Sequence, residues 1–161
     1  MSSDRVRFLF AYGSLMSNAV TAVGATERAF MRRQAELVCK ASIRGRLYDV
    51  GPYPGADLMG HRSERIFGEL WHLPRSRAEL MDLLDRYEGC VQGSQEPHTY
   101  SRQKVVIRPP AGCRRVAWMY VWNGIIDPAA RIASGRWEGP GRTSLEAAVV
   151  PVGAERLGLA A

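Results

Sequence analysis

Long apolar runs are missing from this sequence. The longest, residues 8–12 and 116–122, are far shorter than the ~20 residues that a membrane-spanning helix requires. The first residues, MSSDR, lack the apolar core of a secretory signal peptide. We therefore expect a cytoplasmic protein without a membrane segment.

Cysteine and histidine are scarce as well. The three cysteines, Cys39, Cys90 and Cys113, lie far apart and form no C-x-x-C pair, which argues against a disulfide framework and against a zinc knuckle. The three histidines are equally scattered, at positions 61, 72 and 98. We therefore expect reduced cysteines, no metal site and no cofactor.

Lysine occurs only at positions 40 and 104, so arginine carries most of the positive charge. The net charge is +6, which raises the question of a nucleic-acid partner. However, basic residues form pairs at most, as at residues 32–33 and 114–115, and acidic residues are interleaved with them. Because no basic stripe with aromatic platforms is present, the pattern favours a solvated basic surface over a nucleic-acid interface.

What the chain does contain is typical of a globular protein. Of its 161 residues, 46% are hydrophobic and 24% are charged, so the chain can bury one core but is too short for two full domains. We expect a single domain over residues 1–161, with its core over about 6–137. The Ala/Gly-rich C-terminal tail is expected to be weakly ordered.

Five segments have the composition of β-strands, because they are rich in β-branched and aromatic residues and are bounded by turn residues. They are residues 6–12, 35–48, 65–73, 100–108 and 116–122. The second is expected to bend at Gly45, and the last two are expected to form a hairpin. With few helices and no β-α-β alternation, the sequence predicts an α+β fold: a small, mainly antiparallel sheet or β-barrel with flanking helices.

One segment has clear helical periodicity. Apolar residues recur at helical spacing over residues 80–87, and Ser76 begins an S-x-x-E capping-box pattern. The sequence therefore predicts a helix that starts after Ser76 and carries Glu88 on its last turn. A second, short helix is expected over residues 18–23, ended by Gly24.

The first predicted strand runs directly into the segment Tyr12-Gly13-Ser14-Leu15. Such a turn presents consecutive backbone N–H groups, and its glycine removes the side chain that would obstruct a ligand. These amides can hold either a carboxylate or an oxyanion, and the sequence does not decide between the two. The same letters also occur in ordinary strand-to-turn segments, so the motif carries weight only together with others.

Glu88 is the carboxylate that stands out. At the C-terminal end of a helix, the helix dipole disfavours a negative charge by roughly 0.3–1 kcal/mol. Partial burial raises the pKa of a carboxyl group further. A glutamate in that setting is suited to accept and return a proton, although the local pattern taken alone favours a solvated side chain.

In their order along the chain, these motifs resemble the γ-glutamylcyclotransferase-like family. They are FAYGSLM (10–16), GRLY (45–48) with YPG (53–55), GEL (68–70), LDRYEG (84–89) and YSR (100–102). The match spans roughly positions 8 to 122, and Gly135-Arg136-Trp137 continues it, with arginine where the family often has an acidic residue. The resemblance implies a compact β-barrel with flanking helices and a cavity at one end.

The resemblance also implies roles for individual residues. Glu88 would be the catalytic acid–base. The substrate-binding residues would be Tyr12, Gly13, Ser14, Leu15, Tyr100 and Tyr120. From the residues themselves, Tyr100 could equally be a half-buried strand tyrosine, and Arg102 is expected to be exposed on its strand.

Enzymes of this family convert a γ-glutamyl amine into 5-oxoproline and the free amine. The substrate's own α-amine attacks its γ-carbonyl, so no protein nucleophile is needed and one carboxylate suffices. The resemblance therefore predicts an enzyme whose partner is a small γ-glutamyl amine or amide. The alternative is a non-catalytic module that binds a small anionic metabolite in the same cavity. The leaving amine and the oligomeric state stay open.

Overall fold

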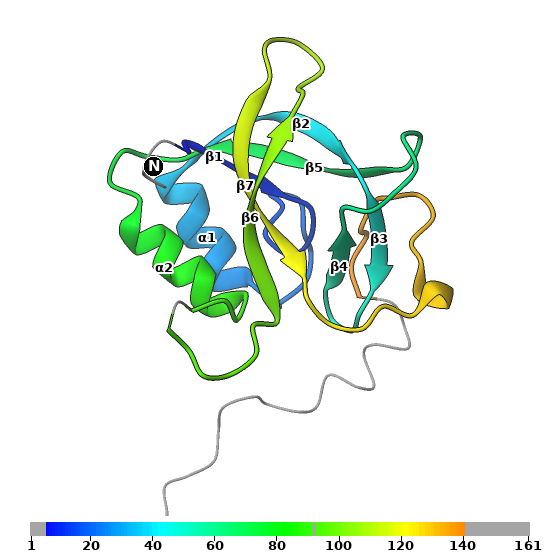
Figure 1. Ribbon diagram of the computed structural model, residues 1–161. Coiled ribbons are helices and arrows are strands. Elements are labelled where there is room, and N and C mark those ends of the chain that lie inside the picture. The colour runs from blue at the N-terminus through cyan, green and yellow to red at the C-terminus, as the bar shows by residue number, and fades with distance from the viewer. Residues whose placement is uncertain (1–5, 92, 141–161) are drawn as a thin grey trace, which may run out of the picture.

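The computed structural model describes residues 6–91 and 93–140 (Figure 1). Its strands are β1 (Phe8–Ala11), β2 (Glu36–Arg44), β3 (Arg46–Asp49), β4 (Pro54–Asp57), β5 (Arg65–His72), β6 (Tyr100–Ile107) and β7 (Arg115–Trp122). Its helices are α1 (Ala25–Gln34), α2 (Ala78–Tyr87) and the 3-10 turn η2 (Pro128–Ala130). Residues 141–161 of the predicted weakly ordered tail lie outside the described residues.

Five of the strands form one sheet in the order β2-β5-β1-β7-β6. The central strand, β1, pairs antiparallel with β5 and parallel with β7, so that Leu9 lies opposite both Trp71 and Trp118. The pairs β2–β5 and β6–β7 are antiparallel, which confirms the predicted hairpin of the last two strands. β3 and β4 form a separate two-stranded sheet.

The larger sheet curls but does not close. Its edge strands, β2 and β6, contact each other, yet no backbone pairing joins them within the described residues. The predicted α+β class and the mainly antiparallel sheet are confirmed. The barrel is an incomplete one, because the two edge strands remain unpaired with each other.

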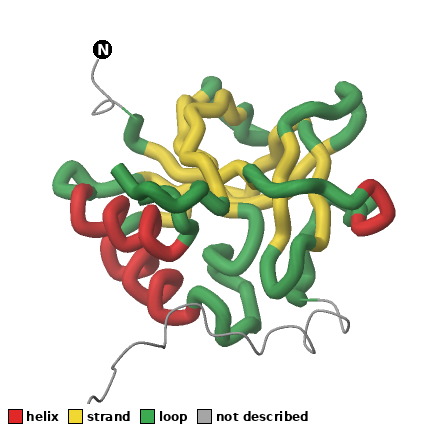
Figure 2. The backbone as a smooth tube through the Cα atoms, turned by 60° about the horizontal axis from the view of Figure 1, so that its bottom comes forward, coloured by secondary structure: helices red, strands yellow, loops and turns green. Residues whose placement is uncertain are grey.

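The two faces of the sheet bury different cores. Along β1, Leu9 and Ala11 belong to the core beneath the helices, whereas Phe10 belongs to the core on the opposite face, as the two-residue period of a strand requires. α1 and α2 lie side by side against the first face (Figure 2). α2 contributes the fully buried Leu84 to that core, so its C-terminal end is held firmly against the sheet.

Gly45 separates β2 from β3, as the sequence predicted. A Cβ atom at this position would lie 2.6 Å from the carbonyl oxygen of Asp57 and 2.8 Å from the side chain of Ile66. Only glycine therefore lets the chain turn here from the large sheet into the β3–β4 pair. The turn brings β4 and its first residue, Pro54, against the loop that follows β1.

The predicted helix over residues 18–23 is wrong. These residues form turns, and the helix lies further along the chain, at α1. Gly24, which the sequence analysis placed at a helix end, has φ 71° and is the N-cap of α1. Met31 is the single buried residue of α1, so the helix has no apolar stripe from which it could have been predicted.

Two further local predictions differ from the structure. α2 begins after Arg77, and no side chain caps it, so the predicted capping box at Ser76 does not form. Residues 54–57, expected as part of a loop, form β4 through pairing with β3. No helix within the described residues is both long enough and apolar enough to span a membrane.

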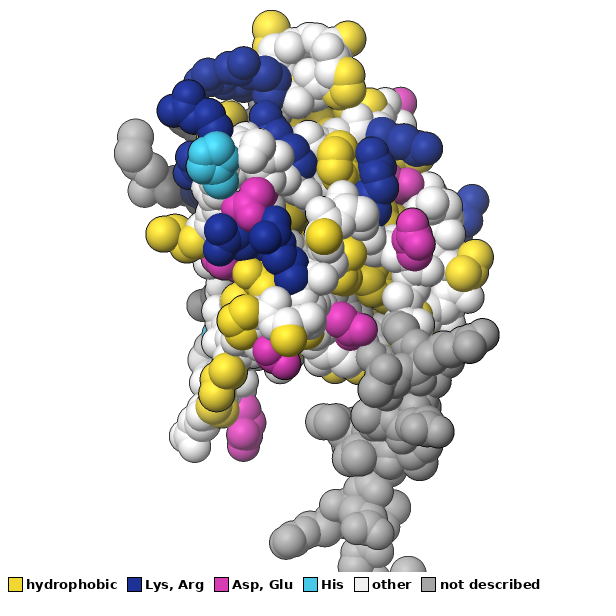
Figure 3. Space-filling model, turned by 90° about the vertical axis from the view of Figure 1, so that its right-hand side faces the viewer, with side chains coloured by type: hydrophobic (Ala, Val, Ile, Leu, Met, Phe, Trp, Pro, Cys, Tyr) yellow, Lys and Arg dark blue, Asp and Glu magenta, His cyan; other side chains and the backbone are white. Residues whose placement is uncertain are grey.

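Basic side chains are dispersed rather than gathered into one stripe on the face drawn in Figure 3, where acidic side chains lie among them. One mixed group joins Glu64 to Arg46 (2.9 Å) and to Arg131. This arrangement agrees with the interleaving of charges along the sequence.

Candidate active site

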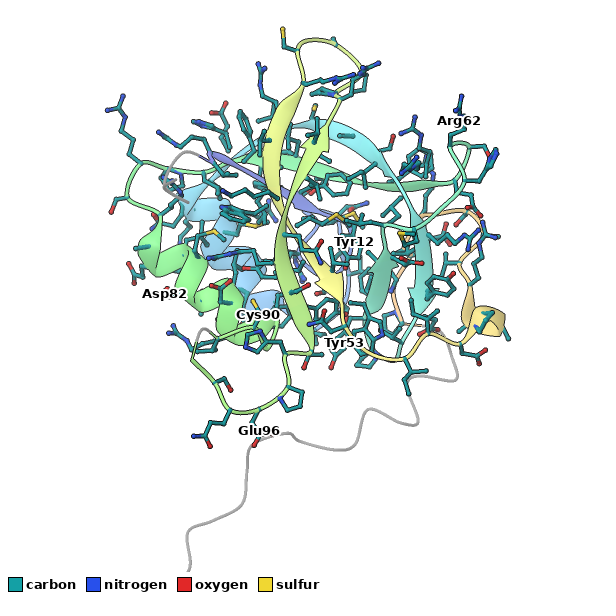
Figure 4. The ribbon with its side chains drawn as sticks, in the orientation of Figure 1. Tyr12, Tyr53, Arg62, Asp82, Cys90 and Glu96 are labelled. Atoms are coloured by element: carbon teal, nitrogen blue, oxygen red, sulfur yellow. The ribbon has the colours of Figure 1, made fainter. Side chains whose placement is uncertain are left out.

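One small cavity, of about 30 Å³, brings together all the residues that the sequence analysis assigned to a site. Its lining residues are Leu9, Phe10, Ala11, Tyr12, Gly13, Ser14, Leu15, Tyr53, Pro54, Glu88, Tyr100 and Tyr120. All of them are buried except Tyr53 and Glu88, which are half-buried. The mouth of the cavity therefore lies between these two side chains. Figure 4 shows Tyr12 in the interior of the molecule and Tyr53 nearer its lower surface.

The loop after β1 forms one wall of the cavity. Gly13 is required there, because a Cβ atom would lie 2.8 Å from the ring of Pro54. The N–H of Met16 donates to the carbonyl of Gly13 (3.0 Å) and closes the turn. Within the described residues, the N–H groups of Gly13, Ser14 and Leu15 have no acceptor. The fold thus leaves three unused donors beside the cavity.

Contacts from three other elements hold this loop in place. Arg28 of α1 donates from Nη1 to the carbonyl of Ser14 (2.6 Å). The Ser14 hydroxyl shares a 2.7 Å hydrogen bond with the hydroxyl of Tyr87 at the end of α2. Glu69 of β5 accepts from the N–H and the hydroxyl of Ser17, at 2.7 and 2.6 Å. A loop fixed in this way can keep its amides in position for a ligand.

The sequence analysis did not identify these anchors. Glu69 was part of a quoted motif, GEL, but its partner Ser17 lies 52 residues away in the chain. Arg28 lies in a helix that the sequence did not predict, so no local pattern pointed to it.

Glu88 is the first residue after α2, and its N–H still donates to the carbonyl of Leu84 (2.9 Å). Gly89 follows with φ 63° and ends the helix. Burial raises the pKa of the Glu88 carboxyl from 4.5 to about 8, and the negative charges of Asp85 and Glu27 add to the effect. No described residue donates a hydrogen bond to this carboxyl group. Glu88 is therefore a carboxyl group that can exchange a proton near neutral pH.

Three tyrosines complete the cavity wall, and their hydroxyl protons are engaged. Tyr100 donates to the carbonyl of Pro54 (2.8 Å), and Tyr120 donates to Oδ1 of Asp85 (2.7 Å). Tyr12 donates to the backbone carbonyl of Tyr120 (2.6 Å). Burial is the main cause that raises the pKa of all three hydroxyls, so they are neutral.

Tyr12 differs from the other two tyrosines. Its hydroxyl also forms a hydrogen bond with the backbone amide of Ala56 in β4, an interaction that lowers its pKa against the larger effect of burial. The hydroxyl thus ties β4 to β7, while the side chain still lines the cavity. Its polar atom is mainly occupied by the protein itself.

Asp85 lies one turn before Glu88 on α2 and is buried. Nη1 of Arg102 contacts both of its oxygens, at 3.0 and 2.8 Å. The expectation that Arg102 would be exposed is therefore wrong, because only 23% of its side chain is accessible in this ion pair. Cys90 also contacts Asp85 (3.5 Å), and burial raises the pKa of its thiol to about 12, which makes it a poor nucleophile.

A metal centre is a separate question. Among residues 6–91 and 93–140, no group of three or more His, Cys, Asp or Glu side chains is placed to hold a metal ion. The chemistry that the described cavity offers is that of one proton-exchanging carboxyl group, neutral tyrosines and backbone amides.

Several solved structures are similar to this chain. YkqA from Bacillus subtilis has a TM-score of 0.58 at 21% identity over 81% of this chain and 39% of its own. An AIG2-like protein from Mus musculus has a TM-score of 0.58 at 15% identity, covering 77% of this chain and 81% of its own. PH0828 from Pyrococcus horikoshii has a TM-score of 0.52 at 15% identity, over 81% and 88%. The chain thus spans about two fifths of the length of YkqA. At these identities the likeness shows the fold alone.

The family comparison covers most of the chain. No curated protein matches it significantly. Residues 9–139, however, match the family described as gamma-glutamyl cyclotransferase, AIG2-like, and this range includes every lining residue of the cavity. The chain therefore belongs to the AIG2-like gamma-glutamyl cyclotransferase family.

Proposed function

We propose that this protein releases 5-oxoproline and a free amine from a γ-glutamyl amine or amide, with Glu88 as general acid–base. One observation carries the proposal. Glu88 is a carboxyl group at the mouth of the cavity whose pKa is raised to about 8 and which no described donor neutralises. Such a group is poised to take up and return protons in the physiological range.

The reaction needs little from the protein beyond orientation and proton transfer. The α-amine of the substrate attacks the γ-carbonyl carbon, and the new C–N bond closes a five-membered ring. Glu88 takes one proton from the attacking nitrogen and returns it to the departing nitrogen as the old C–N bond breaks. Oriented intramolecular attack of this kind reaches effective molarities of roughly 10⁵–10⁸ M in favourable cases, so a folded substrate pose supplies much of the rate.

The match between two pKa values supports Glu88 in this role. An α-ammonium group has a pKa of about 7.7–8.0 in peptides, and the pKa of Glu88 is about 8. A proton can therefore pass between the amine and the carboxylate at little cost in free energy. A glutamate with an ordinary pKa would be a far weaker base toward the same ammonium group.

The loop amides would serve the oxygens of the substrate. The N–H groups of Gly13, Ser14 and Leu15 are donors suited to the α-carboxylate or to the γ-carbonyl oxygen as it becomes an oxyanion. Arg28 and Glu69 would keep these amides in place through their hydrogen bonds to Ser14 and Ser17. Preorganised donors stabilise developing charge without a cost of reorganisation at the moment of reaction.

The size of the cavity places the leaving group. A cavity of about 30 Å³ holds a group about the size of a water molecule and not a complete substrate. The remainder of the substrate would therefore extend through the mouth, between Tyr53 and Glu88, with its leaving amine toward solvent. This pose brings Glu88 next to both nitrogens that exchange protons.

The test is to detect 5-oxoproline by mass spectrometry after incubation with γ-glutamyl amines and γ-glutamyl dipeptides. Wild type should form product, and Glu88→Gln should lose roughly 10²–10⁴-fold in rate. Asp82→Asn, an exposed position on the same helix, is the matched control and should keep full activity. Equal activity of Glu88→Gln would overturn the assignment, and the absence of product from every compound would favour a non-catalytic binding module.

A further inference from the structure

The hydroxyls of Tyr100 and Tyr120 have a fixed polarity. A tyrosine hydroxyl has one proton to donate and two lone pairs with which to accept. The proton of Tyr100 goes to the carbonyl of Pro54, and that of Tyr120 goes to Asp85. Each hydroxyl oxygen can therefore offer the cavity only an acceptor. Both side chains line the cavity together with Glu88.

Asp85 fixes the polarity of Tyr120. Arg102 contacts both carboxylate oxygens of Asp85, at 3.0 and 2.8 Å, so the carboxylate is held in one orientation by its ion pair. A carboxylate can only accept, and Tyr120 at 2.7 Å must therefore donate to it. Asp85 and Arg102 do not line the cavity themselves, so they act on it through Tyr120.

Glu88 stands close to both tyrosines. Its negative charge raises the pKa of the Tyr100 and Tyr120 hydroxyls, in addition to the larger effect of burial. The three side chains together offer a carboxylate and two hydroxyl oxygens. A protonated primary amine has three N–H donors, and a buried ammonium group needs a hydrogen-bond acceptor for each of them. The cavity, of about 30 Å³, is also of a size for such a group.

We propose that Glu88 and the hydroxyl oxygens of Tyr100 and Tyr120 form a subsite for a primary ammonium group, and that Asp85 is the positioning residue that keeps Tyr120 an acceptor. The subsite deepens the proposed function and rests on it in one respect, namely that the ammonium is the α-ammonium of the substrate. The substrate class is then γ-glutamyl compounds with a free α-ammonium group. N-acylated and deaminated analogues lack the three donors and are rejected at the binding step.

The subsite would also favour the attack itself. When the nitrogen passes one proton to Glu88, its other two protons remain hydrogen-bonded to the tyrosine oxygens. As the nitrogen bonds to the carbonyl carbon, it gains positive charge, and acceptors fixed beside it stabilise that charge. The lone pair freed by the proton transfer is then the only part of the nitrogen without a hydrogen-bond partner in the protein, so it is available for attack.

The test compares two inert ligands that differ only at the α-carbon. L-Glutamate has the α-ammonium group and glutarate does not, and calorimetry at pH 7 gives the affinity of each. Wild type should bind L-glutamate at least roughly tenfold more tightly than glutarate, since hydrogen bonds to a charged group are worth about that factor or more. Equal affinities, or no binding of L-glutamate, would overturn the subsite.

Two variants test the role of Asp85. Asp85→Asn removes the charge that fixes Tyr120, and Tyr120→Phe removes the acceptor while keeping the Asp85–Arg102 ion pair. Both should lose roughly 10–100-fold of the preference for L-glutamate. Tyr120→Phe keeps the test decisive if Asp85→Asn fails to fold, as judged by circular dichroism. Asp82→Asn is the control, because Asp82 is exposed on the outer side of α2 (Figure 4) and should leave the preference unchanged.

The subsite and the proposed function can fail separately. Preference for L-glutamate without formation of 5-oxoproline would overturn the proposed function and keep the subsite. Formation of 5-oxoproline with an unchanged preference in both Asp85→Asn and Tyr120→Phe would overturn the subsite and keep the proposed function. A purely structural role of Asp85 predicts loss of stability without any change in the ratio of the two affinities.

Discussion

Glu69 and Glu88 are two glutamates that the fold encloses in different ways. Glu69, on β5, accepts from the N–H and hydroxyl of Ser17 and from Nε1 of Trp71, at 2.7, 2.6 and 3.2 Å. Glu88, after α2, receives no hydrogen bond from any described donor, and the nearby charges that act on it are negative. The first carboxylate is satisfied by its surroundings, whereas the second is not.

The difference separates a structural carboxylate from a reactive one. A buried carboxylate is tolerated when donors compensate for the lost hydration, as around Glu69. Glu88 lacks that compensation, so its protonated form is favoured and its pKa rises to about 8. A fold that keeps such a costly group at the mouth of a cavity points to chemistry rather than to stability.

Size alone would have indicated another region of the surface. A groove of about 480 Å³ is lined by Lys40, Arg108, Arg136 and Trp137, and its volume lies in the range typical of small-molecule sites. Its three cations are exposed, so solvent screens them, and Glu69 at its edge is already satisfied. The cavity of about 30 Å³ is smaller, but it contains the buried polar groups with shifted pKa values.

The largest expected effect is on turnover. Glu88→Gln should reduce the rate of 5-oxoproline formation by roughly 10²–10⁴-fold, because it removes the proton-exchanging group. Glu69→Gln should change the rate far less, since Glu69 acts only through Ser17. Parallel assays with one γ-glutamyl dipeptide measure both. A larger loss in Glu69→Gln than in Glu88→Gln would reverse the roles that we assign.

The pH dependence is the next largest effect. The reaction needs a single proton shared between Glu88 and the substrate amine, and both groups titrate near pH 8. A plot of kcat/KM against pH should therefore be bell-shaped with a maximum near 8 and should fall about tenfold per unit well away from it. Glu27→Gln removes one of the negative charges that raise the pKa of Glu88, so the acidic limb should move to lower pH. A flat profile from pH 6 to 9 would contradict this use of Glu88.

Stability should respond to Glu69→Gln. The amide offers one acceptor oxygen in place of two and brings an NH₂ group toward the donors of Ser17 and Trp71. We expect the free energy of unfolding to fall by roughly 1–3 kcal/mol, as when buried donors lose an acceptor. Urea denaturation at pH 7 measures this change. Unchanged stability would show that these hydrogen bonds are not what keeps Glu69 in place.

Glu88→Gln should affect stability in the opposite direction. The pKa of Glu88 is raised from 4.5 to about 8 on folding, so wild type loses stability as the pH rises through this interval and the folded state must give up the proton. The variant lacks this loss. It should therefore gain roughly 1–2 kcal/mol over wild type at pH 8, and less at lower pH. Thermal unfolding from pH 4 to 8 checks this sign, and a variant that is less stable than wild type at pH 8 would contradict it.

Local pattern was sufficient for the sheet and for α2. Alternation of apolar residues and turn residues predicted the strands, and the spacing of Leu80, Met81 and Leu84 predicted the helix that ends at Glu88. α1 could not be found in the same way, because one buried residue, Met31, gives no periodic signal. Its position depends on packing against α2 and on the hydrogen bonds of Arg28.

The sequence by itself determined the α+β class, the family motifs and the choice of Glu88 as the carboxyl group to examine. The tertiary structure decided the surroundings of that group. Asp85 meets Arg102 and Tyr120 across 17 and 35 residues of chain, and Tyr100 meets Pro54 across 46. No local propensity specifies such distant partners, because they meet only once the sheet has curled and α2 has packed against it. Those contacts decide which pocket oxygens can only accept a hydrogen bond and how strongly Glu88 holds its proton.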